Sequence, residues 1–238
     1  MIASPVPLLD DRRAIAATVG GLTAYVVARR IAIPGDWHLL ANIGATAAVA
    51  GVAFAARLRP AELGLERSTV GAGLRWGAAA AAAVVAAVGA GVLVPATEEW
   101  FADARLDVGL GGMLRRVLVD IPIGTVALEE LAFRGVLLGL LLRVTSPLQA
   151  VVWSVVPFSL WHLPPLLAGG ADAAAGSEIT GSTVAVIAGT LVATAAAGAA
   201  FSWLRLRSGS LVAPALAHWA TNGLTFALAW WAVGDGAS

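Results

Sequence analysis

Three charged residues stand inside a long apolar stretch, and they are the first feature of this sequence that suggests chemistry. The segment ALEELAFRG, residues 127–135, places Glu129, Glu130 and Arg134 between the apolar runs IPIGTV and GVLLGLLL. Charge at membrane depth is costly, and a chain that keeps it there usually uses it. Glu130 and Arg134 are four residues apart and can pair on one helix face, whereas Glu129 is rotated by about 100°. We therefore expect Arg134 to hold Glu130 and leave Glu129 free for a different role.

Two of the three histidines also lie within apolar runs. His162 occurs in PFSLWHLPP, four residues after Phe158, and His218 occurs in PALAHWATNG, four residues before Asn222. A spacing of four places both members of each pair on one helix face. The remaining histidine, His38, stands at the boundary of an apolar run, and we expect it to be interfacial.

A glutamate, two histidines and an asparagine suit the hydrolysis of a peptide bond by water. A desolvated glutamate can act as a general base near neutral pH, and a histidine can hold and polarise a water molecule. Histidine and asparagine can donate hydrogen bonds to a developing oxyanion. Counted along the helices from their inner ends, Glu129 lies at a depth of about 20 Å, His162 at about 24 Å, and His218 and Asn222 at about 12 to 18 Å. One polar cluster is therefore feasible.

The composition identifies the elements that must position these groups. Of the 238 residues, 59% are hydrophobic and 13% charged, and the mean hydropathy is +0.84. A soluble domain carries about a quarter of charged residues. We therefore expect an all-α, polytopic transmembrane helix bundle, with residues 1–238 forming a single integral membrane domain. The net charge of zero gives no reason to expect nucleic acid, and the absence of cysteine excludes disulfides and thiolate metal sites.

Apolar stretches of about 20 residues predict seven membrane spans, with six or eight as alternatives. The spans are expected at 14–33, 38–56, 76–95, 114–142, 147–163, 181–203 and 211–233. Pro122 in the fourth predicts a kink or a break. The alanine-rich third is expected to pack closely through small residues. Tryptophans near span ends are expected to be interfacial anchors; they are Trp37, Trp76, Trp100, Trp161, Trp203, Trp230 and Trp231.

The arginines predict the orientation of these spans. The loop 57–77, RLRPAELGLERSTVGAGLRWG, is rich in arginine and amphipathic enough to lie along the inner membrane surface. By the positive-inside rule the N-terminus is inside and the C-terminus outside. The arginines that support this are Arg12, Arg13, Arg57, Arg59, Arg67, Arg75, Arg143, Arg205 and Arg207. Every cation is arginine, which together with the alanine-rich runs suggests a GC-rich bacterial genome, so we expect the cell membrane of a bacterium.

The segments EELAFRG, FSLWH and HWATN resemble the three motifs EExxxR, FxxxH and HxxxN of the CPBP family. That family comprises type II CAAX prenyl endopeptidases and the bacterial Abi or bacteriocin-processing proteins. The segments RSGSLVAPALAHWATN and RPAELGLER are also similar to the family, and the good resemblance covers about residues 114–226, the expected catalytic core. It implies an all-helical intramembrane protease that acts on a membrane-associated peptide or protein, whether prenylated or not.

The resemblance also implies roles for individual residues. Glu129 is the expected catalytic base and His162 its partner in activating water. His218 and Asn222 form an oxyanion site or, alternatively, bind a metal. The expected supporting residues, which orient the site or pack around it, are Glu130, Arg134 and Phe158.

Three alternatives stay open on the sequence alone. Glu129, His162 and His218 could supply a two-histidine, one-carboxylate zinc site, although we favour a water activated by glutamate with no obligatory metal. Glu130 and Arg134 could be only a buried structural pair. The whole chain could be a non-enzymatic immunity or scaffold protein of the same fold, or a proton-coupled transporter, because buried carboxylates and histidines also serve proton relays.

Overall fold

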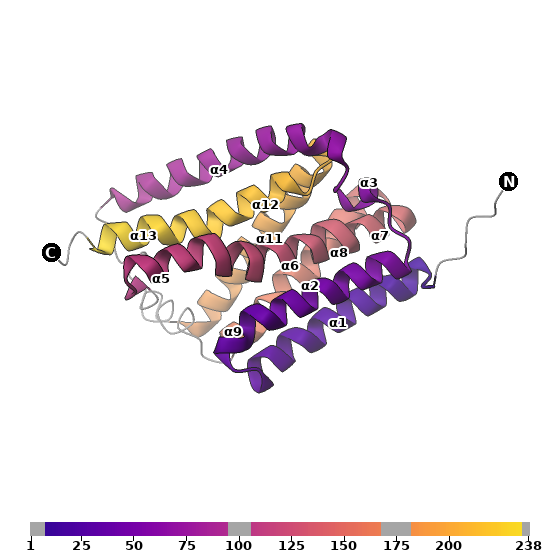
Figure 1. Cartoon of the computed structure of the whole chain (residues 1–238), viewed down its shortest axis with the longest axis horizontal. Coiled ribbons are helices and arrows are strands. Elements are labelled where there is room, and N and C mark those ends of the chain that lie inside the picture. Colours follow the sequence, from indigo (N-terminus) through magenta and orange to yellow (C-terminus); the bar gives the residue numbers. More distant parts are fainter. Residues whose placement is uncertain (1–7, 95–105, 168–181, 235–238) are drawn as a thin grey trace.

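Helices form almost all of the regular structure in the computed structural model, which describes residues 8–94, 106–167 and 182–234. In these residues seven long helical runs pack into a bundle, one for each predicted span (Figure 1). Three of them are α1 (Asp11–Ala32), α2 (His38–Ala55) and α4 (Val70–Val92). The fourth run consists of α5 (Leu110–Arg115), η5 (Arg116–Val126), α6 (Ala127–Glu129), η6 (Glu130–Leu137) and α7 (Leu138–Val144).

The remaining long runs are α8 (Pro147–Trp161), α11 (Thr183–Ser208) and a seventh formed by α12 (Val212–Trp219), η7 (Ala220–Leu224) and α13 (Thr225–Gly234). Short helices connect them: η1 (Gly35–Trp37), α3 (Pro60–Leu63), η2 (Arg67–Thr69) and α9 (Leu163–Leu167). Four described segments are long and apolar enough to cross a membrane, namely Asp11–Ala32, Gly35–Ala55, Pro60–Val92 and Thr183–Ser208. The chain is a multi-pass, all-α membrane helix bundle.

The fourth run does not break at Pro122. Residues 116–126 are π-helical there, and the backbone N–H of Ala127 donates to the carbonyl of Pro122, five residues earlier. A π-helical turn accommodates a residue that has no N–H to donate, so a local change of helix type takes the place of the predicted break. A second π-helical segment, η6, lies in the same run, and a third, η7, lies in the seventh run.

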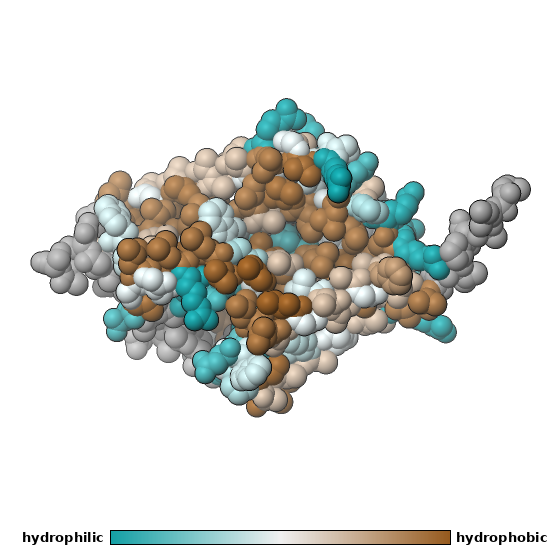
Figure 2. All heavy atoms as spheres, in the orientation of Figure 1, coloured by the Kyte–Doolittle hydropathy of each residue, from teal (hydrophilic) through white to brown (hydrophobic). Residues whose placement is uncertain are grey.

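The distribution of polarity is the reverse of that in a soluble protein. Large apolar side chains such as Ile31 and Phe54 are about 80% exposed, whereas the charged side chains of Glu130 and Arg134 are 1% exposed. Figure 2 shows hydrophobic residues over much of the middle of the visible face, with hydrophilic ones mostly toward the two ends. The bilayer explains this arrangement, because lipid solvates apolar surface and charge must find its partners inside the bundle.

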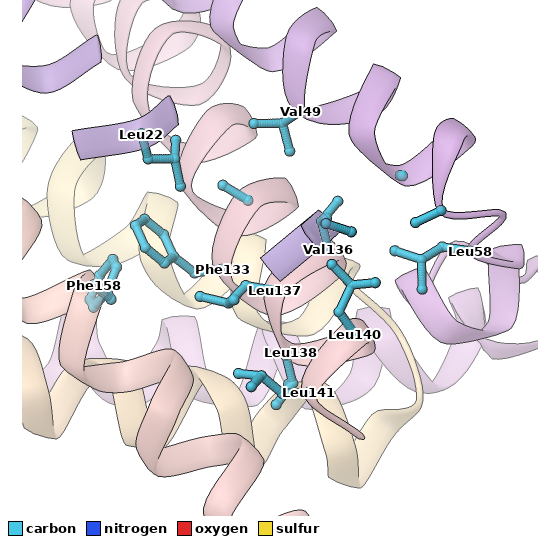
Figure 3. Close-up of a cluster of buried hydrophobic side chains, with 14 of the residues drawn as sticks. Leu22, Val49, Leu58, Phe133, Val136, Leu137, Leu138, Leu140, Leu141 and Phe158 are labelled. Atoms are coloured by element: carbon cyan, nitrogen blue, oxygen red, sulfur yellow. The ribbon is translucent and has the colours of Figure 1, made fainter. Parts of the chain in front are cut away.

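A buried apolar cluster fixes the fourth run against its neighbours. Phe133 and Leu137 of η6 pack with Leu22 of α1, Val49 of α2 and Phe158 of α8 (Figure 3). Lipid tails are as apolar as these side chains, so close packing rather than the hydrophobic effect stabilises such contacts in a membrane. The cluster therefore sets the rotation of the helix that carries the EELAFRG segment.

A network around α3, here called the inner clamp, joins four segments at one end of the bundle. The guanidinium of Arg143 donates to both carboxylate oxygens of Glu62, at 2.8 and 2.9 Å, and to Asp11 at 2.9 Å. Arg205 donates to the backbone carbonyls of Ala61 and Glu62 at 3.1 and 2.9 Å. The predicted inner arginines thus gather at one end, and α3 is held there by the ends of other helices.

Two expectations about the third span need correction. Helix α4 begins at Val70, six residues before the predicted start at residue 76, so the last part of the predicted inner loop, residues 70–77, belongs to this helix. The helix does pack closely through small residues, as expected, but the closest approaches are at two glycines rather than at the alanines. An added Cβ at Gly73 would lie 2.6 Å from the Ser210 hydroxyl, and one at Gly77 would lie 2.9 Å from Leu216. Most of the alanines that follow are half-buried or exposed.

Candidate active site

Three helical runs bring the polar residues of the sequence motifs together. Glu129 is the last residue of α6 and Glu130 the first of η6, so the change from α- to π-helix falls between them. His218 lies near the end of α12, and Asn222 lies in η7 one turn later. Phe158 comes from α8. Segments of π-helix occur frequently at functional sites, and here two of the three described ones carry site residues.

Glu130 is the centre of a buried network of hydrogen bonds. Its Oε1 accepts from Arg134 Nη1 at 3.0 Å, as the spacing of four predicts, and from the Nδ1 of His218 at 2.8 Å. A carboxylate oxygen only accepts, so Nδ1 of His218 carries the hydrogen of this bond. The other ring nitrogen, Nε2, then accepts from the Asn222 side-chain amide at 3.1 Å. The two bonds together fix the tautomer and the orientation of His218.

Glu129 has different surroundings. Its Oε1 accepts from the indole N–H of Trp161 at 3.0 Å. Its Oε2 is buried, has no hydrogen-bond partner in the described part of the chain, and lies 3.8 Å from His218 Nε2. That separation is too long for a direct hydrogen bond, and the one lone pair of Nε2 already accepts from Asn222. The two carboxylates leave the helix in different directions, as expected, and yet both reach the same imidazole ring.

Aromatic rings enclose the charged part of the site. The guanidinium carbon of Arg134 lies 3.8 Å from the centre of the Phe158 ring and 5.1 Å from that of Phe201. Phe201 also stacks on His218, with ring centres 5.0 Å apart and planes inclined by 21°. Cation–π contacts of this kind stabilise a desolvated cation. Phe158 therefore stabilises a buried charge as well as packing.

His162 contacts Phe158 but takes no part in the hydrogen-bond network of this cluster among the described residues. Its Nδ1 donates to the carbonyl of Phe158 in its own helix at 2.9 Å, and its ring lies 5.0 Å from the Phe158 ring. In the described residues it makes no hydrogen bond or ion pair with Glu129 or His218. A carbonyl only accepts, so Nδ1 carries the hydrogen and Nε2 keeps a lone pair, which could accept a proton from water. His38 bonds the Ile33 carbonyl beside η1, away from the cluster.

The two residues that sequence reasoning missed are Phe201 and Trp161. Phe201 lies 17 residues before His218 on another helix, and no spacing rule connects them. Trp161 was expected to be an interfacial anchor from its place near a span end, but its side chain is buried and donates to Glu129. The only signal for Trp161 was its position between two motif residues, in FSLWH.

The proposed zinc ligands Glu129, His162 and His218 are not arranged as a zinc site. In the described ranges no group of three His, Asp or Glu side chains lies close enough together to hold a metal. Both nitrogens of His218 already have partners, and His162 is not joined to Glu129. A zinc site needs at least three protein ligands, so the residues as placed do not form the two-histidine, one-carboxylate set.

Comparison with known families agrees with the motifs. The family model described as type II CAAX prenyl endopeptidase Rce1-like matches residues 113–224, which include every residue of the cluster. The segment that carries the site is similar to the Rce1-like family. Comparisons with curated proteins and with solved structures gave no match.

The Rce1-like segment covers the fourth run from Met113 onward, α8, α11, α12 and η7. Helices α1, α2 and α4 lie outside it, although α1 and α2 pack against η6 and α4 packs along α12. The Rce1-like family is one of proteases, and this chain places the motif residues that resemble it inside a multi-pass membrane bundle.

Proposed function

We propose that this protein is an intramembrane endopeptidase in which Glu129 activates a water molecule for attack on a peptide bond. The observation that carries the proposal is the buried Oε2 of Glu129, which has no hydrogen-bond partner among the described residues and lies 3.8 Å from His218 Nε2. A buried carboxylate oxygen with free lone pairs is suited to general-base catalysis. Similarity to the Rce1-like family supports the same reaction.

The proposed reaction uses the protein's own residues throughout. Glu129 Oε2 takes a proton from water while the water oxygen bonds to the peptide carbonyl carbon. When the tetrahedral intermediate collapses, the C–N bond breaks and the proton passes from Glu129 to the leaving nitrogen. His162 Nε2 is the proposed second contact to the water, because its lone pair has no hydrogen-bond partner among the described residues. Closing this contact requires His162 to approach Glu129 when substrate binds.

The other residues of the cluster are proposed to stabilise the oxyanion and to orient His218. The side-chain amide of Asn222 donates one hydrogen to His218 Nε2, and its second hydrogen can donate to an oxyanion. Glu130 is not proposed as the base, because the guanidinium of Arg134 forms an ion pair with its carboxylate and His218 donates to the same oxygen. We propose that its function is to hold His218, with the Arg134 charge stabilised by Phe158 and Phe201.

The proposed substrate is a membrane-associated peptide or protein in the cell membrane of a bacterium. The test compares purified wild type and Glu129→Gln in lipid nanodiscs on farnesylated and unmodified CAAX peptides, with products read by mass spectrometry. Comparative proteomics of membrane peptides from cells that carry either form extends the search to native substrates. We expect cleavage that depends on Glu129. Identical peptide profiles from the two forms would favour a scaffold, and proton flux in protein-loaded liposomes would favour a transporter.

The three histidines supply an internal comparison for this function. We expect His162→Ala and His218→Ala each to lower kcat/KM by at least about 100-fold, the scale of losing an acid–base or oxyanion group. His38→Ala should leave it near the wild-type value, because His38 bonds only the Ile33 carbonyl among the described residues. Equal losses from all three changes would show that the site has been mislocated.

Chelation tests the metal alternative. Because no three-ligand set is assembled in the described residues, we expect dialysis against a strong chelator to leave the cleavage rate unchanged. Loss of activity together with stoichiometric zinc, and recovery of both when zinc is added back, would overturn the metal-free mechanism.

A further inference from the structure

We propose that Trp161 is a positioning residue for Glu129, and that helices α1 and α2 hold Trp161 in place. The inference rests on the proposed function, because it concerns the geometry of the proposed base. It also gives the N-terminal helices, which lie outside the segment matched by the Rce1-like model, a part in the site.

The first step is the hydrogen bond itself. The indole N–H of Trp161 donates to Oε1 of Glu129 at 3.0 Å, and both side chains are buried. Occupying Oε1 leaves Oε2 as the oxygen that faces His218. An indole is only a donor, so it cannot accept the proton that Glu129 takes from water. Trp161 therefore acts on the reaction through the orientation of the carboxylate.

The second step is the support of the indole ring. Trp161 stacks on Tyr25 of α1, with ring centres 6.2 Å apart and planes inclined by 22°, and meets the edge of Phe133. The Tyr25 hydroxyl in turn donates to the side-chain oxygen of Asn42, a buried residue of α2. A continuous series of contacts thus runs from α2 through α1 and α8 to Glu129.

The third step is the free space beside the ring. An apolar pocket of about 200 Å³ lies between α1 and α8 and is lined by Leu22, Val26, Leu160 and Trp161 among others. Packing alone therefore does not confine the indole on this side. The Tyr25 stack and the hydrogen bond to Glu129 are the contacts that select its orientation, and so each should affect the other.

The main experiment removes the N–H while keeping the ring. Replacing Trp161 by the isostere 3-benzothienylalanine, or by Trp161→Phe, should lower kcat at least about 10-fold on a fluorogenic farnesylated CAAX peptide, with KM within about twofold, because the carboxylate is misplaced and not removed. Trp153 is the matched control, since it lies on the same helix and is 58% exposed. Trp153→Phe should leave both constants unchanged. A purely structural Trp161 would predict wild-type kcat for the isostere.

Helix α1 is tested by a double-mutant cycle. Tyr25→Leu should lower kcat by a similar factor, and adding Trp161→Phe to it should cause little further loss. Fully additive losses in properly folded protein would overturn the proposed route through α1. Melting temperatures of all variants, measured in the same nanodiscs, show whether a loss of kcat reflects a loss of folded protein.

A second measurement is independent of activity. In protein labelled with ¹⁵N-tryptophan, the Trp161 indole resonance, assigned with Trp161→Phe, should move in Glu129→Gln and stay in place in Glu66→Gln, where the exposed Glu66 is the control. An unmoved resonance would overturn the inference. An inactive Glu129→Gln combined with a wild-type kcat for the isostere would refute the inference alone, whereas an active Glu129→Gln would refute the proposed base.

Discussion

Glu129 and Glu130 are neighbours in the chain, but different partners surround their carboxylates. The Oε1 of Glu130 accepts from the Arg134 guanidinium and from His218, whereas the Oε1 of Glu129 accepts from the neutral indole of Trp161; the Oε2 of each carboxylate has no hydrogen-bond partner among the described residues. Tertiary contacts therefore distinguish two chemically identical side chains. This difference separates a structural carboxylate from the one proposed as a base.

Glu130→Gln should destabilise the protein far more than Glu129→Gln. Removing the charge of Glu130 leaves the buried guanidinium of Arg134 without its bonded counter-charge, which costs about 3 to 5 kcal/mol when one partner of a buried pair is lost. Denaturant unfolding in mixed micelles measures the difference. Equal stability of the two variants would mean that Arg134 does not depend on Glu130.

At the scale of helices, α11 approaches α8 closely at one glycine. A Cβ added at Gly198 would lie 2.9 Å from the Phe158 ring and 3.5 Å from Arg134 Nη2. Gly198→Ala should therefore displace Phe158, lowering activity and stability even though alanine favours a helix by about 1 kcal/mol. Gly189, on the same helix, has nothing within 4 Å of its added Cβ, so Gly189→Ala should be neutral or slightly stabilising. Thermal unfolding measures the stability of the two variants, and peptide cleavage measures their activity. A Gly198→Ala variant with wild-type stability and activity would contradict the close approach.

The inner clamp gives the helix ends a dependence on pH. Hydrogen bonds from Arg143 lower the pKa of Glu62, which lies in the short helix α3 of the predicted loop 57–77, from 4.5 to about 2. Because the pKa is lower in the folded state, the stabilisation is present above pH 4.5 and is lost as the pH falls toward 2. It amounts to about 3 kcal/mol at most. The melting temperature of the wild type should therefore fall as the pH is lowered from 4.5 toward 2, and that of Glu62→Gln should fall less. Glu66→Gln, which changes an exposed carboxylate, is the control and should behave like the wild type. Parallel curves would show that the clamp adds no stability.

The whole molecule has one end with the inner clamp and an opposite end where α5 starts and α13 finishes (Figure 1). We predict that the clamp end faces the cytoplasm, because the predicted inner arginines gather there. Reporter fusions at residues 65 and 172 should then report opposite sides of the membrane. Signals from the same side would contradict the seven-span topology.

Much of this architecture is already determined by the sequence. Lipid requires each spanning segment to satisfy its own backbone, so apolar runs of sufficient length predict helices without knowledge of their neighbours. The pairs Glu130–Arg134 and His218–Asn222 follow from helix periodicity, because each lies within one segment. Boundaries were less predictable, since α4 begins at Val70 and the fourth run continues through Pro122 as a π-helix.

Only the tertiary structure decided which segments meet and in what rotation. His218 is 88 residues from Glu130 and Trp161 is 32 residues from Glu129, and no local pattern connects such positions. The rotation of each helix depends on side-chain packing between helices, such as Gly198 against Phe158, and this packing involves several segments at once. For the same reason the motifs alone could not show that Trp161 would reach Glu129 while His162 would remain bonded to its own helix.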